Sequence, residues 1–208
     1  MQPGDNKMQD SNRKPIEIQL VENAAIVRFV RPEIKNPLSI ETLRMLEWEF
    51  SIIEKRPDIE TIIFTGSGNT FAAGANLNEI ASLTGDKAKE FGLYGQNLMQ
   101  KISGSSKRTI AAIDGFCMGG ALDLALACDT RIASPRSVFA HPGVGLGIIT
   151  GWGGTQMLPR LIGESRSMEM FLTGRRIPAE EAYKFGLINK IENKPLEASV
   201  LWLSETSK

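Results

Sequence analysis

The chain has 208 residues, 42% hydrophobic and 23% charged, and its 24 basic and 24 acidic side chains cancel. This composition is typical of a soluble globular protein with one substantial domain, and nothing in the net charge suggests a nucleic-acid partner. No uninterrupted apolar run approaches the roughly 20 residues of a membrane helix, so no membrane partner is expected.

The N-terminal segment is polar and lacks the apolar stretch of a secretory signal, so residues 1–14 are expected to form a disordered leader. Cys117 and Cys128 share one apolar segment and make neither a metal nor a disulfide pattern. Buried free thiols of this kind are typical of a reducing compartment, which predicts a cytoplasmic protein. His141 is the single histidine, so no metal site is expected.

Strands and helices alternate along the first half of the chain. Ser39 is placed to cap a helix whose apolar residues recur at three- and four-residue steps. The predicted elements are strands at 16–19 and 25–30, a turn at Glu22-Asn23, a helix from 39 to about 55, a strand at 61–64, a glycine-rich loop at 65–75, a helix at 87–102 and a strand at 109–113.

The alternation continues in the second half and predicts an α/β fold. Pro178 and Gly186 are placed to open and to end one helix. The predicted elements are a helix from about 120, strands at 130–133 and 138–140, a glycine-rich stretch at 143–154, helices at 156–161, 165–172 and 179–185, a strand at 187–191 and the start of a helix at 196.

Two of the glycine-rich turns predict backbone groups that are open to a ligand. Small side chains occupy the centre of Phe71–Leu77, and Gly119-Gly120 directly precedes the apolar helix. A helix N-terminus presents unpaired N–H groups and favours negative charge, so two such donors could stabilise an oxyanion. On spacing alone, tight packing turns without a ligand are the favoured interpretation, because glycine-rich strand–helix turns are common. No phosphate-binding loop is present, because no Gly-Lys-Ser/Thr sequence occurs.

Several motifs, in order, resemble the enoyl-CoA hydratase/isomerase (crotonase) family. The resemblance covers about residues 16–203. It rests on FAAGANL at 71–77, IAAIDGFCMGGALDLALACD at 110–129, GGTQ at 153–156, LPRLIG at 158–163, MEMFLTG at 168–174 and AEEAYKFGLINK at 179–190.

The resemblance implies a spiral of ββα units that assembles as a homotrimer or a dimer of trimers. It implies an acyl-CoA substrate in fatty acid metabolism, with coenzyme A as part of the substrate and no permanently bound cofactor. The oxyanion donors would be the backbone N–H groups of Ala75 and Gly120. The substrate- and CoA-binding residues would be Lys35, Ala73, Asn76, Leu77, Gly119 and Gly143.

One of these residues has an alternative role, and another differs from the residue that is common in the family. Lys35 fits a solvated surface lysine as well as a phosphate contact, and Asn76 stands where the family commonly has Asp. The core would span residues 15–192, followed at 193–208 by the start of a C-terminal helical region that is shorter than in the family. Natural shortness and truncation of the gene both fit this expectation.

The catalytic positions depart from the family pattern. Asp123 stands at the first carboxylate position, one methylene shorter than the usual Glu, and Gly143 leaves the second position without a side chain. His141 lies two residues before Gly143 and titrates near neutrality, so it could serve as the partner base. Local capping by Asp123 and a purely structural His141 are the alternatives.

Three functions remain compatible with the sequence. The leading prediction is a hydratase- or isomerase-type enzyme that forms a thioester enolate. The second is an acyl-CoA-binding homologue without catalytic activity. The third is another enolate reaction, decarboxylation or thioester hydrolysis, that uses His141. Trp152 is expected near the acyl pocket, mainly as a packing residue.

Overall fold

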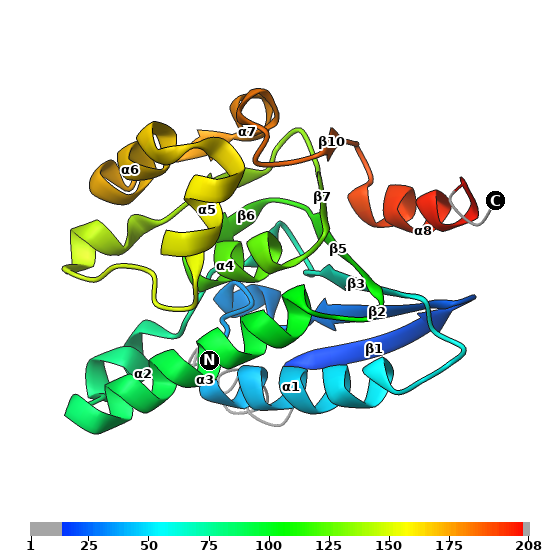
Figure 1. Ribbon diagram of the computed structural model, residues 1–208, viewed down its shortest axis with the longest axis horizontal. Coiled ribbons are helices and arrows are strands. Elements are labelled where there is room, and N and C mark those ends of the chain that lie inside the picture. Colours follow the sequence, from blue (N-terminus) through cyan, green and yellow to red (C-terminus); the bar gives the residue numbers. More distant parts are fainter. Residues whose placement is uncertain (1–13, 206–208) are drawn as a thin grey trace, which may run out of the picture.

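The computed structural model describes residues 14–205, so all of the predicted leader except Lys14 lies outside the described residues. The larger sheet has the strand order β1-β2-β3-β5-β7-β10 (Figure 1). Its strands are β1 (Ile16–Val21), β2 (Ala24–Phe29), β3 (Thr61–Thr65), β5 (Arg108–Ile113), β7 (Thr130–Ala133) and β10 (Lys190–Ile191). β1 and β2 form an antiparallel hairpin around the predicted turn, and the other neighbours are parallel.

A second, smaller sheet has the order β4-β6-β8-β9. Its strands are β4 (Thr70–Ala72), β6 (Phe116–Met118), β8 (Val138–Ala140) and β9 (Ile177–Pro178). In three successive units, a strand of the larger sheet is followed by a strand of the smaller one: β3 by β4, β5 by β6 and β7 by β8. Helices follow each pair, so the predicted spiral of ββα units is confirmed.

The helices of residues 14–205 surround the two sheets. They are α1 (Ile40–Glu54), α2 (Leu77–Ser82), α3 (Gly85–Ser103), α4 (Gly120–Ala127), α5 (Gly154–Ile162), α6 (Glu164–Thr173), α7 (Ala179–Phe185) and α8 (Pro195–Glu205), with the 3-10 turns η2 (Pro32–Ile34) and η3 (Pro142–Leu146). No helix in this part of the chain is long and apolar enough to span a bilayer.

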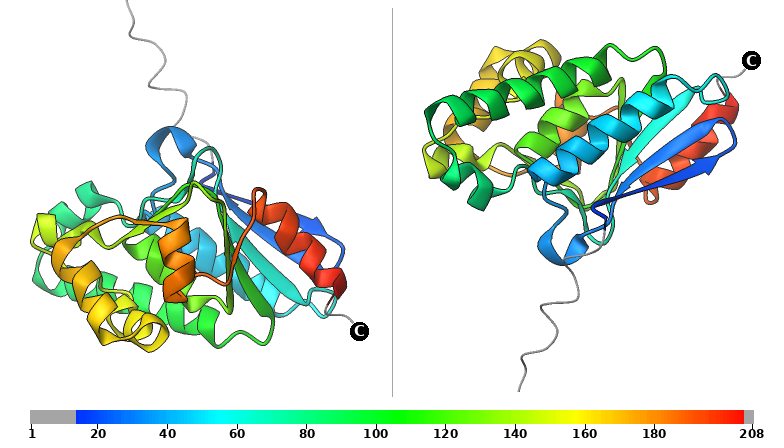
Figure 2. Two further views of the ribbon diagram at one scale, coloured as in Figure 1. Left: turned by 90° about the horizontal axis from the view of Figure 1, so that it is seen from above. Right: turned by 90° about the horizontal axis from the view of Figure 1, so that it is seen from below.

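The central strands β2, β3, β5 and β7 are buried on both faces, and they carry apolar residues on both sides. In β2, Ala25 and Val27 face the main core with α1, α3 and α4, whereas Ala24 and Ile26 face a second cluster. That second cluster includes Leu196 and other side chains of α8. Figure 2 shows α1 and α8 on opposite faces of the sheet. The C-terminal helix therefore completes the second face of the fold.

The structure adds short elements that the sequence pattern did not predict. β4 lies inside the predicted loop 65–75, η3 overlaps the predicted glycine-rich stretch 143–154, and β6 and α2 form in segments that were not assigned. Three-residue strands leave no alternation to detect, and glycine favours a loop prediction. The strand predicted at 187–191 is confirmed only at 190–191, because the Leu187 N–H bonds to Ala182 O, just beyond α7.

Candidate active site

The first glycine turn is held by backbone hydrogen bonds to the segment before α1. Ala73 N donates to Lys35 O at 3.0 Å, and Leu38 N donates to Gly74 O at 2.8 Å. Gly74 has a φ of +88°, a conformation that side chains disfavour. This turn ends at Ala75, directly before α2, so the Ala75 N–H is displayed from a fixed backbone.

The second turn lies at the N-terminus of α4. Gly119 has φ 54° and ψ −124°, a region that is essentially restricted to glycine, and its N–H bonds to Ala140 O at 2.9 Å. Gly120 is the first residue of α4, where an N–H has no intrahelical partner. Among residues 14–205, the backbone hydrogen bonds of turns, loops and helix ends include none that is donated by the Ala75 N–H or by the Gly120 N–H.

The two turns approach each other closely. A Cβ placed on Gly74 would lie 2.6 Å from Met118 O and 3.1 Å from Gly120 N. Any larger residue would therefore push the turns apart. The sequence predicted that donors from the two turns act on one oxygen, and the close approach of the turns in the structure is compatible with that prediction.

Both turns open into one mostly apolar pocket of about 410 Å³. Seven of the predicted site residues line it: Ala73, Ala75, Leu77, Gly119, Gly120, His141 and Gly143. Further apolar side chains come from α2, α3 and the 146–152 segment, namely Ile80, Leu83, Phe91, Leu146, Ile148, Ile149 and Trp152. Such a lining suits a hydrocarbon group beside a few polar donors.

The remaining three predicted site residues do not line this pocket. Lys35 is exposed, with its backbone carbonyl tied to the first turn. The side chain of Asn76 caps α2, since its Oδ1 accepts from Asn78 N at 3.0 Å and Glu79 N at 3.5 Å. Asp123 lies fully buried beneath the lining.

Asp123 is held by donors from the 150–154 segment. Its Oδ2 accepts from the Thr150 hydroxyl and from Trp152 N, and the Gly154 N–H also donates to the carboxylate. Burial raises the pKa of Asp123 to about 6 despite these donors. A Cβ on Gly154 would lie 2.1 Å from Asp123 Oδ1, so glycine is needed there. Asp123 therefore connects α4 to the loop that lines the pocket.

His141 lies between Asp123 and the pocket. Its Nε2 is 3.6 Å from Asp123 Oδ1, beyond hydrogen-bond distance, and neither ring nitrogen has a hydrogen-bond partner within the described chain. The ring packs on Phe171 with centroids 5.2 Å apart. Burial lowers the pKa of His141 to about 4, so the imidazole is neutral at pH 7. A neutral imidazole with an unpartnered nitrogen can accept a proton.

Position 143 has no room for a side chain. A Cβ there would lie 2.6 Å from Ile148 O, and Gly143 O accepts from Ile148 N at 3.0 Å. The backbone of Ile148 therefore occupies the space that a carboxylate side chain at position 143 would need.

Sequence reasoning missed part of the site. Thr150 was not predicted, although it lines the pocket and bonds to Asp123. Trp152 does pack, as expected, but between two glycines: a Cβ on Gly95 or on Gly120 would lie within 2.3 Å of its ring. Trp152 also meets Phe91 edge-on at 5.5 Å. The packing of Trp152 against Gly95 and Gly120 could not be predicted from one sequence, because these glycines are far from Trp152 along the chain.

Comparison with protein families and with curated proteins gives one family. A model described as enoyl-CoA hydratase/isomerase matches residues 20–201. A crotonyl-CoA hydratase of Syntrophomonas wolfei is 39% identical over 177 residues, which cover 85% of this chain and 68% of that protein. A short-chain-enoyl-CoA hydratase of Clostridium acetobutylicum is 37% identical over 168 residues, which cover 80% of this chain and 64% of that protein. The chain thus spans about two thirds of these relatives' length.

Solved structures show the same fold. An enoyl-CoA hydratase from Thermoplasma volcanium superposes with a TM-score of 0.89 and 33% identity, over 94% of this chain and 79% of that one. An enoyl-CoA hydratase from Bacillus anthracis superposes with a TM-score of 0.86 and 33% identity, over 92% of this chain and 75% of that one.

Proposed function

Because this chain belongs to the enoyl-CoA hydratase/isomerase family, we propose that it binds an acyl-CoA thioester and stabilises the enolate of that thioester. The observation that carries the proposal is the close approach of the Gly74 and Gly120 turns at the edge of one mostly apolar pocket. The acyl group would occupy the apolar lining. The thioester carbonyl would accept hydrogen bonds from Ala75 N and Gly120 N.

These donors suit a carbonyl that gains negative charge. When a proton leaves the α-carbon or the γ-carbon of an enoyl thioester, the electron pair moves towards the carbonyl oxygen. Gly120 N is at the positive end of the α4 dipole, and both donors are set by the backbone before the charge develops. Each such donor contributes about 3–4 kcal/mol to the transition state.

Asp123 and His141 would handle the proton. At pH 7 Asp123 is ionised and His141 is neutral, so the imidazole that lines the pocket can take a carbon-bound proton and pass it to the carboxylate, which is the stronger base of the two. Return of the proton to a different carbon completes an isomerisation. In hydration, water adds at the β-carbon and gives a different enolate, that of the β-hydroxy thioester, whose negative charge also lies on the carbonyl oxygen until the α-carbon is protonated.

The absence of a side chain at the second carboxylate position, Gly143, supports a second candidate function. In this function the protein binds acyl-CoA and catalyses no reaction. Gly143 offers no side chain, and Asp123 is sealed beneath the pocket lining. This candidate keeps the backbone donors and therefore predicts thioester binding that is insensitive to changes at Asp123 and His141.

The proposal is tested by incubating the protein in deuterated water with a panel of saturated, 2-enoyl and 3-enoyl CoA thioesters. Mass spectrometry should show deuterium at the α- or γ-carbon, which reports enolate formation even when the natural acyl group is missing. Binding without deuterium incorporation would favour the silent binder. Release of free CoA or loss of a carboxyl group would favour thioester hydrolysis or decarboxylation at His141, and no binding would overturn the proposal.

Three further features stay predictions. The first is that Lys35 and Asn76 contact coenzyme A from outside the apolar pocket. The second is that the protein needs no permanently bound cofactor. Assembly as a homotrimer or a dimer of trimers is the third. Sedimentation analysis of the purified protein, with and without butyryl-CoA, measures the assembly directly.

A further inference from the structure

The first oxyanion turn depends on a segment far away in sequence. Residues 35–38, between η2 and α1, run beside residues 73–75, and Leu38 pairs with Ala75 in a parallel bridge. Two backbone hydrogen bonds hold the segments together, one from Ala73 N to Lys35 O and one from Leu38 N to Gly74 O. Both are made by the two residues that precede Ala75. The position of the Ala75 N–H is thus tied to the 35–38 segment.

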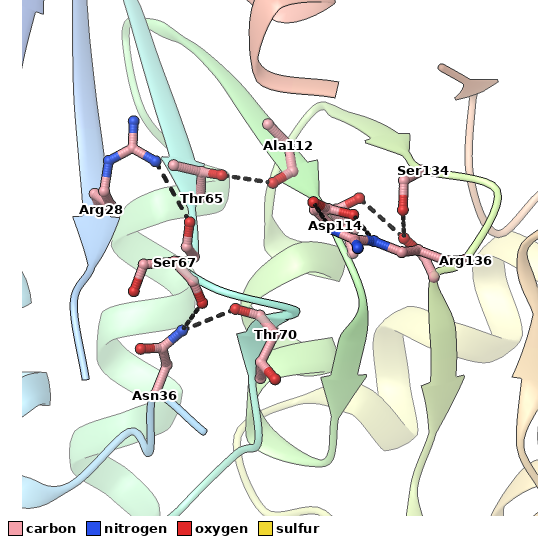
Figure 3. Close-up of polar contacts among 12 residues, drawn as sticks. Arg28, Asn36, Thr65, Ser67, Thr70, Ala112, Asp114, Ser134 and Arg136 are labelled. Carbon is pink, nitrogen blue, oxygen red and sulfur yellow. Dashed lines mark hydrogen bonds and ion pairs between the residues drawn. The ribbon is translucent and has the colours of Figure 1, made fainter. Parts of the chain in front are cut away.

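Asn36 joins this segment to the start of the same turn through its side chain. Its Nδ2 donates to Thr70 O at 2.8 Å and to Ser67 O at 3.1 Å (Figure 3). A weaker bond runs to Phe71 O at 3.4 Å. Its Oδ1 accepts from Arg31 N at 2.8 Å. Asn36 is only 2% exposed, and its bonds to Thr70 O and Phe71 O are buried in a low-dielectric interior, whereas those with Ser67 O and Arg31 N are partly buried.

The chemistry of this position demands asparagine. Asn36 has a φ of 49°, a left-handed conformation that asparagine tolerates better than most residues. The same side chain must donate to several carbonyl oxygens and accept one N–H. An aspartate has the same shape, but its carboxylate would face those carbonyl oxygens without a proton to donate.

The second turn is built differently. Gly119 is held by backbone bonds, through its N–H to Ala140 O and through its carbonyl, which accepts from Leu122 N and Asp123 N. The first turn therefore combines backbone bonds with a buried side-chain amide.

We infer that Asn36 is a positioning residue for the oxyanion site: its amide fixes the 67–71 carbonyls and, through the paired backbone, the direction of the Ala75 N–H. The inference rests on the proposed function. It predicts that loss of the amide weakens carbonyl polarisation and leaves binding of the CoA thioester largely intact.

The test uses butyryl-CoA labelled with ¹³C at the thioester carbonyl, a saturated ligand that cannot be hydrated. Difference infrared spectra of the bound ligand should show the carbonyl stretch at lower frequency than in water. In Asn36→Asp most of that shift should be lost, while the Kd for butyryl-CoA changes by less than about threefold. With crotonyl-CoA, kcat should fall about 100-fold at nearly constant KM, as for loss of one oxyanion donor.

Two further variants keep the test decisive. Asn36→Gly preserves the left-handed backbone without an amide, so it should show the same loss if Asn36→Asp fails to fold. Ser137→Ala removes a buried hydroxyl that bonds to Ile113 O and Ser134 Oγ, away from both turns, and should keep the full infrared shift. This control separates a general loss of buried hydrogen bonds from a change at the turn.

The outcomes separate the two proposals. A full shift in the unaltered protein that persists in both Asn36 variants would overturn the role of Asn36 and leave the proposed function standing. Absence of a shift for butyryl-CoA bound to the unaltered protein, or absence of binding, would overturn the oxyanion site and the role of Asn36 together.

Discussion

The backbone side and the side-chain side of the pocket are held in different ways. On the backbone side, the turns at Gly74 and Gly119 are fixed by main-chain bonds and by conformations that glycine adopts readily. On the other side, the polar groups converge on Asp123, which accepts from Thr150, Trp152 and Gly154, while His141 lies just beyond hydrogen-bond distance.

This difference separates binding from reaction. Backbone donors do not depend on the identity of the side chains that line the pocket, so carbonyl binding tolerates departures such as Gly143. Proton transfer depends on a few ionisable groups whose charge is set by burial. We therefore expect changes on the two sides of the pocket to have distinct kinetic signatures.

The largest effect is expected at Asp123. Asp123→Asn keeps the shape and an acceptor oxygen but cannot ionise, so it should lower kcat for the turned-over thioester by about 10²–10⁴-fold. Binding of butyryl-CoA, which depends on the backbone side, should change little. Steady-state kinetics and calorimetry measure the two quantities, and unchanged turnover would assign Asp123 a structural role.

A slightly smaller effect is expected on the backbone side. Gly74→Ala places a Cβ 2.6 Å from Met118 O, which forces the two turns apart, so kcat/KM should fall about 10²–10³-fold. Gly186→Ala is the matched control. Gly186 also has a positive φ, of 78°, but a Cβ there meets open space at the end of α7.

The control should lose only about 1 kcal/mol of stability from backbone strain and keep its activity. Equal losses of activity in the two variants would show that the approach of the turns has no special role.

The third prediction concerns stability against pH. The pKa of Asp123 is raised to about 6, so the folded state holds the extra proton and this contribution falls as pH rises from about 4 to 6. The pKa of His141 is lowered to about 4, so the unfolded chain holds the extra proton and this contribution rises from about pH 4 to 6.5. The two contributions oppose each other.

Asp123→Asn should remove the contribution of Asp123, which opposes that of His141. Its free energy of unfolding should rise with pH by about 3 kcal/mol more than that of the unaltered protein between about pH 4 and 6.5. Guanidinium denaturation at several pH values measures this difference. Parallel pH profiles for the two proteins would show that burial does not control these two groups.

The smallest effect is expected on restoring a carboxylate at position 143. Gly143→Glu should not raise hydration, because its Cβ would meet Ile148 O at 2.6 Å, and it should cost about 1–3 kcal/mol of stability. Gly151→Ala, in the same loop with open space around it, should stay within about 0.5 kcal/mol. A stable Gly143→Glu variant with faster hydration would show that the loop reopens readily.

Much of the fold was predictable because local patterns and the fold agree. The Ser39 cap of α1 is confirmed by the bond from Thr42 N to Ser39 Oγ, and the apolar stripes of that helix face the core. The short strands β4 and β6 were not predictable, since three residues beside glycine carry no periodic pattern. They form because neighbouring strands of the smaller sheet supply their hydrogen bonds.

The sequence by itself determined the family, the order of the main elements and the two glycine turns, because these depend on local patterns and motifs. Only the tertiary structure decided how closely Gly74 approaches Gly120, that Asp123 is buried beneath the pocket and that Asn36 holds the 67–71 segment. Such contacts join residues that are tens of positions apart. Their energies depend on burial and distance, which arise only when the chain packs.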